Sequence, residues 1–477
     1  MISLGIGTLQ AQLRRGDIAA NDIAEQVIAN HERLEPALNA FSRFDAQGIR
    51  RQAKAADAAF AAGIDLGPFQ GLPISVKDLY GVSGFKTFAG TPRPLPAGFG
   101  IEGALVQAMR RQGALITGKT HTVEFAFGGL GTNRHYGAPR NPWDDIQHRV
   151  SGGSSSGAGV SLWQGTALLA LGSDTTGSVR MPASWTGTVG LKVSIGRWPT
   201  DGLVSQSETL DTPGVLTCTV DDLVWAFAAL DPEGLRWDEF RAGIHGVHLE
   251  SLRLGVPKNF FFDQCSPGVA EGVRQALDEL RDAGATLVPF ELPEADAAYD
   301  LWQRGHVSAA EAYTTLTTQF QDRIATLDPD VWSRIKSCGE ITAADYIERR
   351  RQIHAWMDQV NGRLCAVDAF VTPTIAITAP TVAAVADLDG YRRHNLAASR
   401  NAAILSLFDL CAITLPVARD VEGVPVGMQV ACRRRTEPRL IAIAAAMERT
   451  LGTARNRLGT PPLISAPDHD AQVTARP

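Results

Sequence analysis

The residues best suited to chemistry are a segment rich in serine, threonine and glycine at 151–192, and an upstream lysine, Lys77. A serine hydroxyl is too weakly acidic to attack a carbonyl carbon unaided, so it needs a base within hydrogen-bond reach, directly or through a relay. Lys77 alternates with Ile74 and Val76, which predicts a short strand with the lysine on the opposite face. Burying a charged lysine inside a sheet costs free energy, so such a lysine is expected to have a function. Burial also lowers the pKa of its ammonium group, because it disfavours the charged form. Each feature alone has another interpretation. A serine-rich stretch is typical of an ordinary loop, and a lone lysine in a strand is typical of a solvent-exposed edge strand.

Two short patterns match known motifs but stand in the wrong context. GALITGKT, residues 113–120, fits the GxxxxGK[ST] phosphate-binding loop. That loop needs a strand before it and exposed amides between its glycines, whereas here a helical segment precedes it and ALIT is itself strand-like. Residues 153–157 fit the GxSxG nucleophile turn with Ser155 at its centre, but the preceding DDIQHRVS is too polar for the strand that this turn requires. Neither chemistry is expected.

Several spaced blocks in a fixed order are more specific than either short pattern. The central ones are GGSS at 152–155, GSDTTGSVRMPA at 172–183, and Gly187 followed by GLK at 190–192. GLPISVKDLYG and GKTHTVEFAFGGLGTN stand upstream, and SETLDTPGVLT, FVTPT and GVPVGMQV stand downstream. This set resembles the signature of the amidase signature family, with coverage to about residue 452. The resemblance implies hydrolysis of a carboxamide C–N bond.

The resemblance also implies a role for each of three residues. Lys77 takes the place of the family's base, Ser154 that of the bridging serine, and Ser178 that of the nucleophile. Ser154 would pass the proton between the other two and later to the leaving amine. A cis peptide bond before Ser154 is implied as well, and Gly153 would ease it. The expected intermediate is an acyl-enzyme on Ser178.

The loop at the expected nucleophile is predicted to stabilise the oxyanion of the tetrahedral intermediate through backbone N–H groups. The expected donors are Thr175, Thr176, Gly177 and Ser178. Asp174 and Arg180 bracket this loop and are candidates for holding it by hydrogen bonds or an ion pair. The alternative for these two residues is ordinary loop anchoring.

The acyl pocket is expected, by position, to be lined by Phe127, Gly128 and Gly129. Three residues depart from the family pattern: Thr176 replaces a glycine, and Ser156 and Ala158 replace a glycine and a serine. A β-branched residue at 176 would narrow the pocket, add a hydroxyl donor or strain the loop. These departures leave the three catalytic candidates intact and the identity of the amide open.

Predicted strands and helices alternate along the chain, which indicates an α/β fold in one domain, residues 1–462. The resemblance implies a large mixed central β-sheet flanked by helices. The expected parts are a helical N-terminus at 1–65, with Asn21 capping a helix at 22–34, the signature core at 66–220, a helical layer at about 225–365, and C-terminal strands with a helix at 366–452. Residues 463–477 are expected to be disordered.

The composition favours a soluble enzyme acting on small molecules. The net charge of -6 and the lack of a long basic run give no footprint for nucleic acid. No apolar run approaches the ~20 residues of a membrane helix, and the N-terminus lacks a signal-peptide core. Six scattered cysteines without a CxxC pair indicate reduced thiols and a cytoplasmic protein. A homodimer is left open.

No metal or other cofactor is expected. His121, His135 and His148 are the candidates for a metal site, but their spacing matches no ligand pattern on a helix or hairpin.

Three functions are compared. The leading hypothesis is an amidase for a small carboxamide or urea-like amide. The second is the glutaminase-type subunit of a tRNA-dependent amidotransferase, which would need partner subunits and is disfavoured by the departures in both glycine blocks. The third is a non-catalytic binding protein on the same scaffold, disfavoured because all three catalytic candidates are present.

Overall fold

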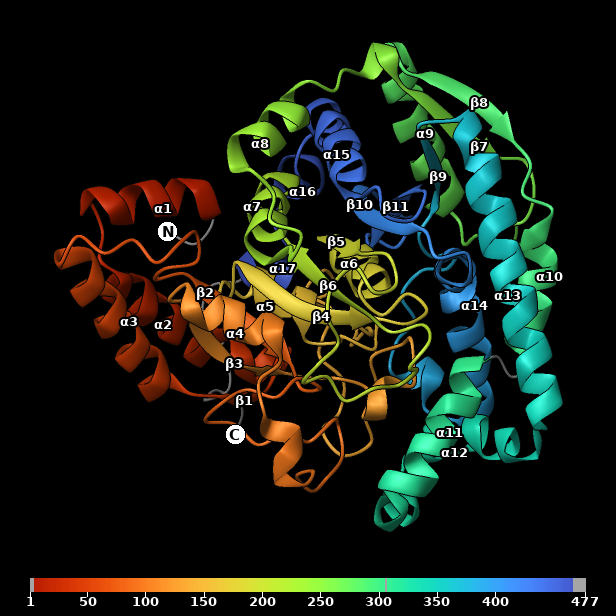
Figure 1. Cartoon of the computed structure of the whole chain (residues 1–477), viewed down its shortest axis with the longest axis horizontal. Helices are drawn as coiled ribbons and strands as arrows, with labels where there is room; N and C mark the ends of the chain where they lie inside the picture. Colours follow the sequence, from red (N-terminus) through yellow and green to blue (C-terminus); the bar gives the residue numbers. More distant parts are fainter. Residues whose placement is uncertain (1–3, 305–306, 466–477) are drawn as a thin grey trace, which may run out of the picture.

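The computed structural model describes residues 4–304 and 307–465. Within them the strands form one mixed sheet of eleven, in the order β1-β3-β2-β4-β6-β5-β10-β11-β9-β7-β8 (Figure 1), which confirms the predicted fold class. The strands are β1 (Phe41–Phe44), β2 (Pro73–Lys77), β3 (Leu115–Thr120), β4 (Leu169–Asp174), β5 (Val189–Lys192), β6 (Thr212–Thr217), β7 (Arg253–Pro257), β8 (Thr286–Phe290), β9 (Ala369–Pro373), β10 (Cys411–Arg419) and β11 (Pro425–Cys432).

The N-terminal helices lie beside the β1 edge of the sheet (Figure 1). They are α1 (Ile6–Arg15), α2 (Ala20–Leu38) and α3 (Ala46–Ala61). The prediction that Asn21 caps α2 is wrong, because the helix already begins at Ala20. Carboxylates cap this end instead: Asp57 accepts the N–H groups of Ala20 and Asn21, and Asp22 accepts that of Ala19.

Helices cover both faces of the sheet. The next helices along the chain are α4 (Ala104–Arg111), α5 (Ala158–Trp163), α6 (Arg180–Thr186), α7 (Val220–Leu230), α8 (Trp237–His245) and α9 (Val269–Asp282). On β4, Leu169 and Leu171 join the core cluster that contains α4, α7 and α9, whereas Ala170 packs with α5 and α6. Because successive side chains of a strand point to opposite faces, α5 and α6 cover the other side.

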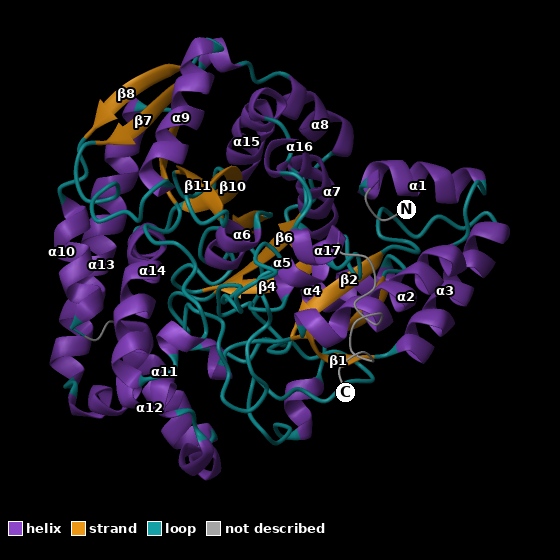
Figure 2. Cartoon of the chain, turned by 180° about the vertical axis from the view of Figure 1, so that it is seen from behind, coloured by secondary structure: helices purple, strands orange, loops and turns teal. Residues whose placement is uncertain are grey.

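The remaining helices follow the chain to the end of the described residues. They are α10 (Glu294–Gln303), α11 (Val307–Gln319), α12 (Pro329–Ile335), α13 (Ala343–Arg363), α14 (Leu388–Leu407), α15 (Glu437–Leu451), α16 (Ala454–Leu458) and α17 (Pro462–Ser465). Helices α10, α13 and α14 lie side by side, away from α1–α3 (Figure 2). Helix α15 ends at Gly452, with φ of 87°, as its glycine predicts.

Two parts of the predicted organisation differ from the structure. The segment at 225–365 is not only helical, because it contributes β7 and β8, which pair in parallel at the edge of the sheet. Residues 463–465, the first of the predicted disordered tail, belong to α17, where Leu463 is buried. Residues 466–477 lie outside the described residues.

The phosphate-loop pattern is part of a buried strand. Residues 115–120 of the pattern form β3, so the interval between Gly113 and Gly118 is largely a buried strand and not a loop with exposed amides. The Lys119 ammonium is fully buried and pairs with Asp78, with 2.9 Å between Nζ and Oδ1. This ion pair explains a buried lysine at this position without a phosphate ligand.

Candidate active site

Lys77 ends β2 on the face covered by α5 and α6. Its neighbours Ile74 and Val76 belong to the core cluster on the opposite face, as the alternation predicts. The Lys77 Nζ atom donates a hydrogen bond to Ser154 Oγ over 2.7 Å and another to Ser173 Oγ over 2.9 Å. All three side chains are buried. The structure therefore places the predicted base and the predicted bridging serine in direct contact.

The environment of Lys77 suits a base. Burial lowers the pKa of its ammonium from its usual value to about 7, although the carboxylates of Asp211 and Asp174 oppose this shift. Burial has this effect because a low dielectric medium disfavours the charged form. Near neutral pH a large fraction of Lys77 is therefore unprotonated and able to accept a proton.

Ser178 lies in the loop between β4 and α6, next to the segment that carries Ser154. The Ser155 N–H donates to the Ser178 carbonyl over 3.2 Å, and the Gly153–Ser154 peptide bond is cis, as the resemblance implied. No hydrogen bond joins the Ser178 and Ser154 hydroxyls in the described structure. The contact between the predicted base and the predicted bridging serine is thus formed, and the predicted nucleophile lies on the adjoining loop.

The Ser178 loop is held by an ion pair with no solvent exposure. Arg180 Nε and Nη2 donate to the two carboxylate oxygens of Asp174, each over 3.0 Å. Asp174 also accepts the N–H of Gly177 over 2.6 Å and that of Val179 over 3.2 Å. Burial would raise the pKa of Asp174, but the Arg180 guanidinium and these amides lower it to about 2. The pair therefore anchors the loop that carries Ser178, and whether it influences the chemistry stays a prediction.

The Gly177 amide is already occupied, which changes the expected set of oxyanion donors. It donates to Asp174, whereas the amides of Thr175, Thr176 and Ser178 have no acceptor among the described residues. Backbone N–H groups in a protein interior are normally paired. The geometry therefore favours Thr176 and Ser178, which line the pocket, over Gly177 as donors to an oxyanion.

A second carboxylate supports the loop, and the sequence did not single it out. The Asp211 carboxylate accepts hydrogen bonds from the Thr175 hydroxyl over 2.6 Å, from the Ser205 hydroxyl over 2.9 Å and from the backbone N–H of Gln206 over 2.9 Å. It stands in SETLDTPG, a block that the sequence placed in the family order without a role. Ser173, the second partner of Lys77, was missed in the same way within GSDTTGS.

A small pocket opens on Ser178, with a volume of about 20 Å³. Its lining comprises Ala126, Phe127, Gly128, Gly129, Thr176, Ser178, Met181, Gln206, Trp302, Arg334 and Ser399. The three residues predicted along the acyl pocket are all present. Trp302, Arg334 and Ser399 come from α10, α12 and α14, so helices far along the chain from the Ser178 loop contribute to the same pocket.

The chain is matched by the family model described as Amidase over residues 22–441. The chain belongs to the amidase family. The structure of this amidase is also similar to a crystal structure described as an amidase, with a TM-score of 0.84, 28% identity, and coverage of 94% of this chain and 100% of the other. Sequence and fold together make the chain an amidohydrolase.

Two curated relatives show where the amidase lies within the family. It is 44% identical to the 2-amino-5-chloromuconic acid deaminase of Comamonas testosteroni, over 96% of this chain and 99% of that protein. It is 32% identical to a glutamyl-tRNA(Gln) amidotransferase subunit from Nitratidesulfovibrio vulgaris, over 94% of this chain and 97% of that protein. The amidotransferase subunits are thus the more distant relatives.

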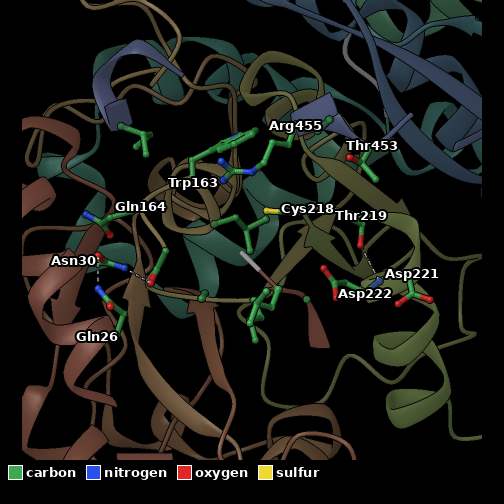
Figure 3. A pocket seen from close by; sticks show the side chains of 18 of the residues that line it. Gln26, Asn30, Trp163, Gln164, Cys218, Thr219, Asp221, Asp222, Thr453 and Arg455 are labelled. Atoms are coloured by element: carbon green, nitrogen blue, oxygen red, sulfur yellow. Dashed lines mark hydrogen bonds between the residues drawn. The ribbon is translucent and has the colours of Figure 1, made fainter. Parts of the chain in front are cut away.

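A larger pocket of the amidase, about 570 Å³, lies apart from this chemistry (Figure 3). Its lining includes Trp163, Cys218, Asp222 and Arg455 but none of Lys77, Ser154 and Ser178. Burial raises the pKa of the Cys218 thiol to about 12, so this thiol is a poor nucleophile. The small pocket is the better candidate for the active site, because Ser178 lines it, whereas none of the three catalytic candidates lines the larger pocket.

The three histidines considered for a metal have separate neighbours. His121 bonds Asn39, His148 bonds the Ala138 carbonyl, and His135 lies 3.4 Å from Glu124. Across residues 4–304 and 307–465, no group of three or more His, Cys, Asp or Glu side chains has an arrangement suited to a metal ion. In the same residues, no helix combines the length and apolar character needed to cross a bilayer.

Proposed function

We propose that this amidase releases ammonia from a small amide through an acyl-enzyme on Ser178, with Lys77 as the base and Ser154 as the relay. The observation that carries the proposal is the buried contact of 2.7 Å between Lys77 Nζ and Ser154 Oγ, at a lysine whose pKa is lowered to about 7.

The reaction runs in two balanced steps. In the first, neutral Lys77 takes the Ser178 proton by way of Ser154, and Ser178 Oγ adds to the carbonyl carbon. The oxyanion is held by the amides of Thr176 and Ser178. The proton then returns through Ser154 to the leaving nitrogen, and ammonia departs. In the second step water adds to the ester by the same route, and the carboxylic acid is released.

The 44% identity supports a second candidate function within the same site. The relative is named for the deamination of an aminated, doubly unsaturated dicarboxylic acid. In this amidase, the corresponding reaction would begin with tautomerisation of the enamine to an imine. Water would then add to the imine carbon, and ammonia would leave to give a ketone. Both candidates release ammonia, and they differ in whether the product is a new carboxylate or a new ketone.

The decisive experiment combines active-site labelling with product analysis. A fluorophosphonate should form one covalent adduct, mapped by peptide mass spectrometry to Ser178 and lost in Ser178→Ala. An ammonia-release screen over aliphatic, aryl and ureido amides, and over 2-aminomuconate, then separates the two candidates. Labelling at another residue, or a Lys77→Ala variant with near-normal turnover, would contradict the mechanism.

The amidotransferase alternative predicts a different result in the same screen. Glutamine would then be the preferred amide, and turnover would rise when partner subunits are added. Cytoplasmic localisation and the homodimer remain predictions from the sequence.

A further inference from the structure

Arg334 is the one charged residue among the described residues that line the pocket at Ser178. It lies near the end of α12, in the helical layer, and lines the pocket together with Ser178. The other polar side chains of the lining are neutral, namely the hydroxyls of Thr176, Ser178 and Ser399, the side-chain amide of Gln206 and the indole of Trp302. The pocket therefore presents one fixed positive charge to whatever binds beside the nucleophile.

The Arg334 guanidinium is held in place by neutral groups. Nη1 donates to the Phe127 carbonyl over 3.1 Å, and the guanidinium carbon lies 4.6 Å from the centre of the Phe127 ring and 5.9 Å from that of Tyr391. A cation against aromatic faces is held in position without being neutralised. The arginine is thus oriented by Phe127, which itself lines the pocket.

No carboxylate of the described residues forms an ion pair with Arg334. The nearby Asp330 stands one helical turn earlier on α12 and lines a different pocket, together with Arg134 and Asp328. Burial lowers the pKa of the Arg334 guanidinium, and Tyr391 and Asp330 counter this effect only in part. A partly buried cation without a carboxylate in direct contact is costly, and an anion bound from outside would lower that cost.

We propose that Arg334 binds a carboxylate group of the substrate, so that this amidase prefers small amides or amines that carry an acid group. A guanidinium has five N–H donors in a planar fork that matches the two oxygens of a carboxylate, and the Phe127 carbonyl takes a donor from only one of its nitrogens. This inference rests on the proposed function, because it takes Ser178 as the reacting residue of the same pocket.

Two amides of equal size test the proposal. Succinamate carries a carboxylate where 4-methylpentanamide carries an isopropyl group. We expect the wild-type enzyme to prefer succinamate, and Arg334→Met to lower that preference by about 10- to 100-fold, chiefly through KM, since a bond between charged groups is lost. Arg334→Lys should retain part of the preference, because the charge remains without the fork. Arg351→Met, at an exposed arginine of α13, is the matched control.

A binding measurement keeps this test independent of turnover. Succinate should raise the unfolding temperature of the wild-type protein and protect Ser178 from the fluorophosphonate, and both effects should be lost in Arg334→Met. If Ser178 is never labelled while succinate still stabilises the protein through Arg334, the proposed function fails and the carboxylate site stands. If Ser178 is labelled but succinate has no effect, or Arg334→Met slows both amides equally, the carboxylate site is wrong.

Discussion

Lys77 and Ser154 are separated by 77 residues in the chain, yet the Lys77 ammonium nitrogen and the Ser154 hydroxyl oxygen lie 2.7 Å apart in a fully buried contact. The contact joins the end of a sheet strand to the loop before α5. Because burial lowers the pKa of Lys77 to about 7, the same contact determines how the activity should respond to pH.

The pH profile should rise through neutrality. Below the lowered pKa Lys77 is protonated and cannot accept the Ser178 proton, and above it the neutral amine can. The value of kcat/KM should therefore rise with pH, reach half its maximum at about pH 7 and level off at higher pH. Initial rates with one amide between about pH 5 and pH 9 measure this. A midpoint of ~10.4, the pKa of a solvated lysine, would contradict it.

Removing the relay hydroxyl should abolish most of the activity. Ser154→Ala should lower kcat by about 10²- to 10⁴-fold, the usual contribution of positioned proton transfer, with a smaller change in KM. Ser156→Ala is the matched control two residues on, because the buried Ser156 hydroxyl has no hydrogen-bond partner in the described structure. Equal losses in the two variants would show that the loop, and not the relay, is being disturbed.

Breaking the Asp174–Arg180 pair should destabilise the fold. Arg180→Met leaves the Asp174 carboxylate buried without its counter-ion, and we expect the free energy of unfolding to fall by about 3–5 kcal/mol. Denaturant unfolding measures this change. Arg281→Met, at an exposed pair with Asp278, should leave the unfolding midpoint nearly unchanged. A midpoint for Arg180→Met close to wild type would mean that the pair is not what holds the loop.

Thr176→Gly should widen the range of substrates. The threonine lines the small pocket at Ser178, and removing its side chain frees space beside the nucleophile. Each added methylene in a pocket typically changes discrimination by ~10- to 200-fold, so branched acyl chains should gain relative to linear ones by about 10-fold or more. The ratio of kcat/KM for a branched and a linear amide gives the result. An unchanged ratio would show that Thr176 does not shape the acyl pocket.

The three catalytic candidates could be named from the sequence because their signals are local. Lys77 sits in an alternating strand pattern, and Ser154 and Ser178 sit in dense, spaced glycine and serine blocks. The residues that complete the pocket carry no such signal. Gln206 and Arg334 stand in ordinary loop and helix contexts, and only packing brings α12 against the Phe127 carbonyl.

The strands β7 and β8 were missed for a related reason. Their sequences, RLGVP and TLVPF, are short and partly exposed at the sheet edge, so they lack the continuous apolar run of a central strand. They lie in a segment whose neighbours on both sides are strongly helical. Their pairing with each other and of β7 with β9 decides their structure, and pairing is a long-range property.

By itself the sequence determined the α/β class, the family resemblance and the candidates for base, relay and nucleophile, because each depends on residue type and on spacing along the chain. The tertiary structure decided which atoms meet. It directs the Gly177 amide to Asp174 and not to the pocket. It places Ser173 against Lys77, and Asp211 against Thr175. It also brings Arg334, which has no carboxylate partner among the described residues, into the pocket at Ser178. These outcomes depend on distances across the fold, which folding sets through burial and packing of segments far apart in the chain.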